Sequence, residues 1–177
     1  MSWAIKIFFD ARMDGAVRAM WASLEELDLS YQMSASGYRP HLTLLGMEDC
    51  NIKCAETCLK NMATHSRQFA LCVGAVGIFP QEPATVYLSP IICPELQHLY
   101  YHLIENRKHF GAKFSPYYLP DAWIPHITLA CRLNSNDLDK AASLVCAQFK
   151  PLVGRAHSIA LVHIPSGEES FRVDLGT

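Results

Sequence analysis

A five-residue phrase, Pro-His-x-Thr-Leu, occurs twice in the sequence and contains the residues best suited to chemistry. Its histidines are His41 and His126, which lie 85 residues apart, and its threonines are Thr43 and Thr128. Each copy is short, has apolar neighbours and begins at a proline, which is typical of a β-strand. Because side chains two residues apart on a strand share a face, we expect each histidine to point the same way as its threonine.

Paired imidazoles and hydroxyls are suited to acid–base chemistry on a phosphate ester. An unperturbed histidine titrates near about pH 6.5, so one copy can accept a proton from a nucleophile while the other donates one to a leaving oxygen. Each such proton transfer is worth about 10²–10⁴-fold in rate. The threonine hydroxyls can hold the non-bridging oxygens of the phosphate, where negative charge develops. Two histidines without further ligands at fixed spacing make a poor zinc set, so we expect neither a metal nor another cofactor.

A single copy of the phrase would indicate only an ordinary half-buried strand, so the repetition carries the argument. Side chains near either copy are additional candidates for substrate binding, because aromatic faces can stack on a base and arginines attract phosphate. These candidates are Tyr38, Arg39, Phe79, Tyr118, Trp123 and Arg132, with Lys113 as a weaker one. The alternative for each aromatic residue is ordinary packing, and for each arginine it is a solvated surface charge.

The hydrophobic pattern predicts an alternation of strands and helices that positions the two phrases. Strands are predicted at residues 3–9, 40–44, 69–79, 84–89, 123–130, 158–164 and 170–175. Helices are predicted at 14–29, 51–64, 94–109 and about 134–149, the last with an asparagine cap. The loops 34–39 and 111–122 precede the two phrases, and we expect them to influence substrate choice.

The same order of elements occurs twice: strand, helix, histidine strand, helix, strand. Shifting one half by 85 residues superimposes the units, which indicates an internal duplication within a single bilobal domain of residues 1–177. The first half covers about 1–82 and the second about 83–177. The predicted fold class is α+β, with two antiparallel sheets around a central groove and helices outside. Each wall of this groove would carry one His-x-Thr pair.

Composition limits the classes of protein that the chain can belong to. Hydrophobic residues make up 50% and charged residues 18%, which predicts a folded core. A net charge of −2 gives no overall attraction to nucleic acid or anionic membranes, so anion binding must be local. No signal peptide, membrane span or obligate protein partner is evident. The seven scattered cysteines favour free thiols and a cytoplasmic location, and Cys50, Cys54 and Cys58 are expected to pack on one helix face.

The two His-x-Thr motifs, together with Trp-x-Pro-His-x-Thr-Leu at Trp123–Leu129, resemble the 2H phosphoesterase superfamily. This group includes 2'-5' RNA ligase-like proteins and cyclic phosphodiesterases, and the resemblance covers nearly the whole chain. A strand containing glycine and phenylalanine also follows the first motif in many relatives, and Gly74, Gly77 and Phe79 are loosely similar to it.

The resemblance implies a bilobal fold and metal-independent cleavage of a phosphodiester next to a ribose 2' oxygen. It makes His41 and His126 the acid and base, in an order left open, and Thr43 and Thr128 the phosphate-binding residues. Family substrates are 2',3'-cyclic phosphates or 2'-5'-linked oligonucleotides, so the expected partner is a nucleotide or an RNA end, and ligation would be the reverse reaction. Two alternatives remain open here: a catalytically silent RNA- or nucleotide-binding module, and an unrelated α+β protein with a fortuitous repeat.

Overall fold

The structure is a computed structural model that describes residues 2–29, 33, 37–164 and 166–177. The elements are, in order, β1 (Trp3–Phe9), α1 (Ala11–Glu25), β2 (His41–Glu48), α3 (Ile52–His65), β3 (Phe69–Phe79), β4 (Ala84–Pro90), α4 (Pro94–Asn106), the 3₁₀ helix η1 (Arg107–Phe110), β5 (Lys113–Phe114), the 3₁₀ helix η2 (Pro116–Tyr118), β6 (Ile127–Leu133), α5 (Ser135–Gln148), β7 (Leu152–His163) and β8 (Glu169–Asp174). The predicted double series of strand, helix, histidine strand, helix and strand is confirmed by this order.

Local sequence explains where the helices begin. The side chain of Asp10 accepts a hydrogen bond from the backbone N–H of Met13 at 2.9 Å, so α1 starts three residues earlier than predicted. The predicted asparagine cap of α5 is confirmed, because Asn134 accepts from the N–H of Asp137 at 2.9 Å. Such caps satisfy backbone donors that have no partner within the helix.

The strands of the described chain form one antiparallel sheet of eight strands rather than the two sheets predicted. Its order is β5-β2-β1-β7-β3-β4-β6, and β8 also pairs with β7. The reason is the length of β7, which has 12 residues. Its first residues pair with β3, and from Ala156 onward it pairs with β1, so that it belongs to both halves of the sheet.

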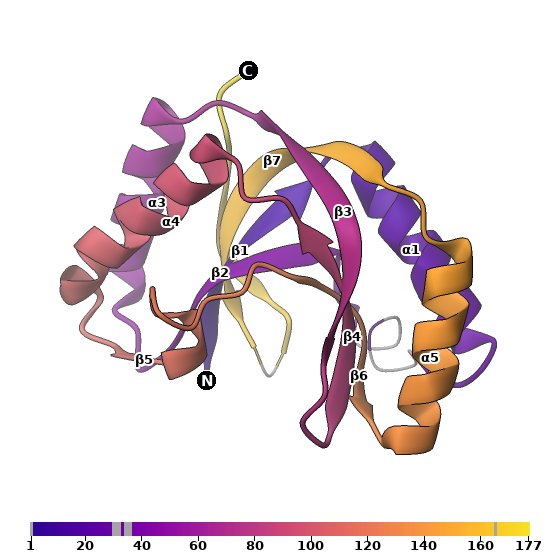
Figure 1. Ribbon diagram of the computed structural model, residues 1–177. Helices are drawn as coiled ribbons and strands as arrows, with labels where there is room; N and C mark the ends of the chain where they lie inside the picture. The colour runs from indigo at the N-terminus through magenta and orange to yellow at the C-terminus, as the bar shows by residue number, and fades with distance from the viewer. Residues whose placement is uncertain (1, 30–32, 34–36, 165) are drawn as a thin grey trace.

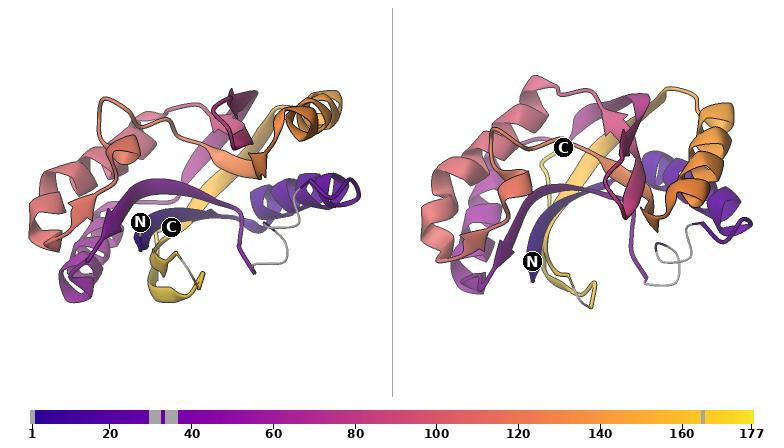
Figure 2. Two further views of the ribbon diagram at one scale, coloured as in Figure 1. Left: turned by 90° about the horizontal axis from the view of Figure 1, so that it is seen from below. Right: turned by 60° about the horizontal axis from the view of Figure 1, so that its bottom comes forward.

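The last long strand of each sequence half pairs with a strand of the other half. Strand β3 pairs with β4, and β7 pairs with β1. Helices α3 and α4 pack together at one end of the sheet, and α1 and α5 pack together at the other (Figure 1). The view from below shows the strands running between these two pairs of helices (Figure 2). One large hydrophobic cluster includes residues from both ends.

Two predictions about loops have different outcomes. The predicted loop 111–122 contains the two-residue strand β5 and the short helix η2, which are too brief for a periodic pattern to reveal. The predicted loop 34–39 lies partly outside the described residues, since only Gly37, Tyr38 and Arg39 of it are described. None of the helices in the described part of the chain has the length and hydropathy that crossing a bilayer requires.

Candidate active site

The two motif strands have the same irregularity at the same place. On β2, Thr43 lies opposite Lys6 of β1, and the pairing then skips Leu44. On β6, Thr128 lies opposite Tyr87 of β4, and the pairing skips the equivalent Leu129. A bulge of this kind bends a strand and re-aims its side chains, and bulges often lie next to active sites. The matching bulges support the internal duplication and give both His-x-Thr pairs the same local geometry.

Both motif histidines are held in the same way by the backbone two residues earlier. The Nδ1 atom of His41 lies 2.7 Å from the carbonyl oxygen of Arg39, and Nδ1 of His126 lies 2.7 Å from that of Ile124. A carbonyl oxygen can only accept a hydrogen bond, so Nδ1 carries the proton in each ring. In the neutral rings, Nε2 is therefore the basic atom, and it is left for another group.

The fold brings the two motifs together through two tryptophans that reach across the sequence halves. The indole N–H of Trp123 donates to the carbonyl of Thr43 at 3.1 Å, and that of Trp21 donates to the carbonyl of Thr128 at 3.0 Å. Strands β2 and β6 contact each other. His41 and His126 are close enough for the charge of His126 to lower the pKa of His41.

His41 is half-buried beside a buried lysine. Burial is the largest cause that lowers the pKa of His41, to about 3, and the positive charge of Lys6 lowers it further. The hydrogen bond to the carbonyl of Arg39 opposes this shift. Tyr38 packs nearby, with its ring centre 6.2 Å from that of His41, and its hydroxyl donates to the carbonyl of Ile164 at 3.0 Å. This imidazole is therefore neutral throughout the physiological pH range.

Lys6 is a candidate functional residue that the sequence analysis did not identify. Its side chain is only 3% exposed, and its ammonium lies 5.0 Å from the centre of the Tyr38 ring. Burial lowers the pKa of Lys6 to about 8, although the negative charge of Glu169 opposes the shift. The available signal was a single charge in the middle of an apolar strand, because a buried lysine is costly and rare outside functional sites.

His126 has an aromatic environment instead. The rings of Phe79 and Tyr87 stack on each other at 4.3 Å, and their centres lie 5.1 Å and 5.5 Å from that of His126. Burial lowers the pKa of His126 below its ordinary value, and the hydrogen bond to Ile124 opposes this. Tyr87 was not identified from the sequence, whereas Phe79 was predicted near the site and lies there. The ring of Tyr87 covers Gly77, where an added Cβ would lie 2.3 Å from Tyr87 Cζ.

Tyr118 and Trp123 lie beside Thr43, where both have structural partners. Tyr118 forms a side-chain hydrogen bond with Thr43, and burial nevertheless raises the pKa of its phenol. The ring of Trp123 stacks on Tyr100 of α4 at a centroid distance of 3.9 Å and an interplanar angle of 4°. One face and the N–H of this indole are therefore in contact with the protein.

The three basic candidates have different locations. Arg39 lies next to His41, since both residues line a small cavity of about 40 Å³ together with Lys6 and Glu169. Arg132 is exposed and lies at the opposite end of β6 from His126, in the left-handed backbone region with φ = 60°. Lys113 is exposed, and its ammonium lies 3.8 Å from Glu48. Of these three, only Arg39 lies beside a motif histidine, His41.

The cysteines of the described chain are all free thiols, and those near α3 are partly buried. Burial raises the pKa of Cys50 and of Cys58 to about 11, which makes these thiols unreactive at neutral pH. Within the described residues, His, Cys, Asp and Glu side chains form no group of three or more that could hold a metal ion.

A sheet that holds two His-x-Thr pairs on equivalent bulged strands defines the 2H phosphoesterase class of fold. The family model for the 2'-5' RNA ligase superfamily matches residues 16–168. The chain belongs to this superfamily.

Solved structures with the same fold cover almost the whole molecule. A protein of Thermus thermophilus, TT0787, matches with a TM-score of 0.67 and 16% identity. E. coli LigT in complex with 3'-AMP matches with a TM-score of 0.64 and 17% identity, and a structure described as a phosphoesterase with 0.61 and 15%. Each alignment covers 99% of this chain and 98% of the other. A search of curated proteins finds no match to the chain.

Proposed function

We propose that the protein is a metal-independent phosphodiesterase that acts next to a ribose 2' oxygen, with His41 and His126 transferring the protons. The observation that carries this proposal is the matched hydrogen bonding of the two Nδ1 atoms. This hydrogen bonding leaves the Nε2 atom of each imidazole available to a substrate. Thr43 and Thr128 each lie two residues after one of the histidines. Proton transfer at both the attacking and the leaving oxygen then needs only these two side chains.

The surroundings of the two histidines support a role for each in this proposal. His41 is the general base, because burial and the charge of Lys6 keep its ring neutral. His126 is the general acid, because the negative charge of a bound phosphate raises the pKa of an imidazole beside it and favours the protonated form. Lys6 and the two threonine hydroxyls stabilise the negative charge that develops on the phosphate oxygens.

In the hydrolysis of a 2',3'-cyclic phosphate, one histidine transfers a proton as each bond forms or breaks. Nε2 of His41 takes a proton from water as the water oxygen bonds to phosphorus. One of the two ring P–O bonds breaks, and Nε2 of His126 donates its proton to the departing ribose oxygen. The product is a phosphate monoester, and the two histidines exchange protonation states until solvent restores them. The complex of LigT with 3'-AMP supports a nucleotide substrate, because that protein shares this fold.

The test is turnover of a nucleoside 2',3'-cyclic phosphate by the full chain in the presence of a chelator. We expect His41→Ala and His126→Ala each to lower kcat by at least about 10²-fold, because each removes one proton transfer. The exposed His109→Ala is the matched control and should retain full activity.

Circular dichroism checks that both variants remain folded. Binding of the cyclic phosphate without turnover by the unmodified protein would instead support a silent nucleotide-binding module. Turnover that survives either single substitution would remove that histidine from the mechanism.

A further inference from the structure

A cluster of positive charge lies beside His41, on the ring of Phe8. The centre of the Phe8 ring is 6.3 Å from that of His41. The guanidinium carbon of Arg39 lies 4.8 Å from the Phe8 ring centre, and that of Arg172, on β8, lies 5.3 Å from it. The imidazole and both guanidinium groups therefore surround one phenyl ring, although they come from different segments of the chain.

The cations in this cluster outnumber the carboxylates that contact them. Nη1 of Arg39 lies 3.5 Å from Oε1 of Glu169, and Nη1 of Arg172 lies 3.7 Å from Oε2 of the same residue. Glu169 also acts on Lys6, whose pKa it raises. Asp174 lies 4.0 Å from Nε of Arg172, and it is also 3.5 Å from His157. Three side-chain cations thus share two carboxylates, in a chain whose net charge is −2.

Space for a ligand adjoins these cations. Arg39 lines the small cavity that contains His41 and Lys6. It also lines a larger cavity of about 400 Å³ together with Arg172, Arg18 and His157. The larger cavity has the size of a nucleotide subsite, and Arg39 connects it to the cavity beside the histidine. Two carboxylates on the α1 side also line this cavity. Asp14 is paired with Arg18, and Asp10 accepts the hydrogen bond from the backbone N–H of Met13.

We propose that Arg39 and Arg172 bind a second phosphate group of the substrate, separated by one sugar from the phosphorus that lies between the histidines. This inference rests on the proposed function, and it specifies the substrate class as a nucleotide with at least two phosphate groups. Planar guanidinium groups match the oxygens of a phosphate and bind it through paired hydrogen bonds. The phosphate enters beside Glu169, which holds both arginines in place and limits affinity by its own negative charge.

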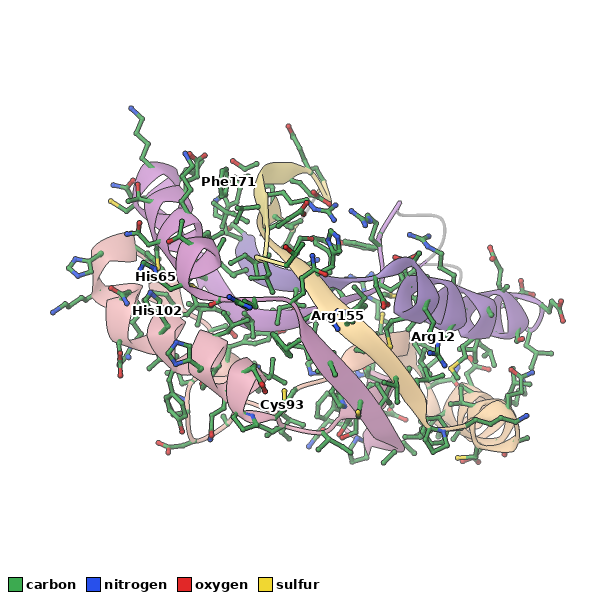
Figure 3. The ribbon with its side chains drawn as sticks, turned by 90° about the horizontal axis from the view of Figure 1, so that it is seen from above. Arg12, His65, Cys93, His102, Arg155 and Phe171 are labelled. Carbon is green, nitrogen blue, oxygen red and sulfur yellow. The ribbon has the colours of Figure 1, made fainter. Side chains whose placement is uncertain are left out.

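The test compares two ligands that differ by one phosphate: adenosine 2'-monophosphate and adenosine 2',5'-bisphosphate. Calorimetric titration of the full chain should show the bisphosphate binding at least about 10-fold more tightly. Arg172→Gln and Arg39→Gln should each remove most of this advantage. Arg172→Gln should leave the affinity for the monophosphate within about twofold, because Arg172 does not line the cavity that contains His41. Glu169→Gln should increase the advantage, because it removes the competing carboxylate. Arg12→Gln is the matched control, since Arg12 is exposed on α1, outside the residues that line either cavity (Figure 3).

A bisphosphate-to-monophosphate ratio that is unchanged in Arg172→Gln and Arg39→Gln would overturn the inference. If these variants also had a lower melting temperature than the unmodified protein, the arginine–glutamate pairs would have only a structural role. Because binding is measured without turnover, the outcome is independent of the acid–base roles of His41 and His126.

A third ligand identifies the source of the second phosphate. A dinucleotide with a terminal 2'-phosphate, an internal phosphodiester and no 5'-phosphate should bind as tightly as the bisphosphate if the site binds the internal phosphodiester of an oligonucleotide. It should bind only as tightly as the monophosphate if the site binds a terminal phosphate group.

Discussion

Lys6 gives the two equivalent histidines different electrostatic surroundings. Its ammonium is buried at the position opposite Thr43, whereas the position opposite Thr128 is occupied by Tyr87. The positive charge lowers the pKa of His41, while the neighbours of His126 are aromatic. In the proposed mechanism, the non-equivalent residues Lys6 and Tyr87 therefore give the two copies of the motif different surroundings.

Replacing Lys6 by methionine should increase the stability of the protein. The folded protein lowers the pKa of Lys6 from 10.5 to about 8, so its charged form costs stability at any pH below about 8. Lys6→Met should therefore raise the free energy of unfolding at pH 7 by about 2 kcal/mol, within the range seen when buried charges are replaced by apolar side chains. Denaturant unfolding measures this change, and a loss of stability would contradict it.

The same variant should shift the pH dependence of the rate. The lysine charge lowers the pKa of His41, so its removal raises that pKa, and the base becomes protonated at a higher pH. The acid limb of kcat/KM should lie near pH 3 in the unmodified protein and at higher pH in Lys6→Met. The alkaline limb, where His126 loses its proton, should begin below about pH 6.5 in both proteins because burial lowers its pKa. An acid limb that does not move would exclude Lys6 as a neighbour of the base.

Sequence reasoning found the histidines and threonines because their phrase recurs, and it missed Lys6 and Tyr87 for a physical reason. These two residues occupy positions opposite the motif threonines, and only the register of the paired strands reveals this. Register depends on the bulges at Leu44 and Leu129, which no hydrophobic pattern predicts. Arg172 was missed for the same reason, because β8 lies beside β7 and far from both motifs in the chain.

At the scale of the elements, a glycine of β3 provides the space for an aromatic ring beside His126. The ring of Tyr87 lies directly over Gly77, and it stacks on Phe79 two residues further along the strand. The sequence analysis predicted this strand at residues 69–79, and these are its observed bounds. It did not predict the approach of Tyr87 to Gly77, because Tyr87 lies on a neighbouring strand.

Gly77→Ala should lower activity by displacing Tyr87 from its place beside His126. The new methyl group would lie 2.3 Å from Tyr87 Cζ, so the ring must move. We expect kcat/KM to fall by about 10- to 100-fold, and stability to fall by about 1–3 kcal/mol from overpacking. Steady-state kinetics and thermal unfolding measure these two effects.

Gly74→Ala is the matched control on the same strand, because its added Cβ would meet only the flexible side chain of Ile91, at 3.3 Å. It should change stability by less than about 1 kcal/mol and leave kcat/KM unchanged. Equal activity of the two variants would show that Tyr87 can move without affecting His126.

At the scale of the whole molecule, one sheet joins the two sequence halves. The sheet is continuous because β7 pairs with both β1 and β3, and β3 completes the part of the sheet that contains β4 and β6. The duplication was visible in the sequence because it preserves the order of elements. The exchange of β3 and β7 between the halves was not visible, because a repeat has the same pattern whichever partner each strand pairs with.

The fragments 1–82 and 83–177 should therefore fail to fold separately. Within the described chain, the first fragment would leave β3 without β4 and β7, and the second would leave β7 without β1 and β3. We expect the full chain to unfold in one cooperative transition and each fragment to show none, as measured by circular dichroism during heating. A sigmoidal transition in either fragment would show that a sequence half is a domain.

The crossed indole hydrogen bonds give the site an intrinsic optical reporter. The chain has three tryptophans, and two of them, Trp21 and Trp123, donate directly to the backbone of the strands that carry the histidines. Indole emission responds to nearby charge and to the geometry of its N–H partner. Ligand occupancy between the two motifs can therefore be followed by fluorescence of the unlabelled protein, and the replacement of either tryptophan by phenylalanine assigns the signal to one side of the site.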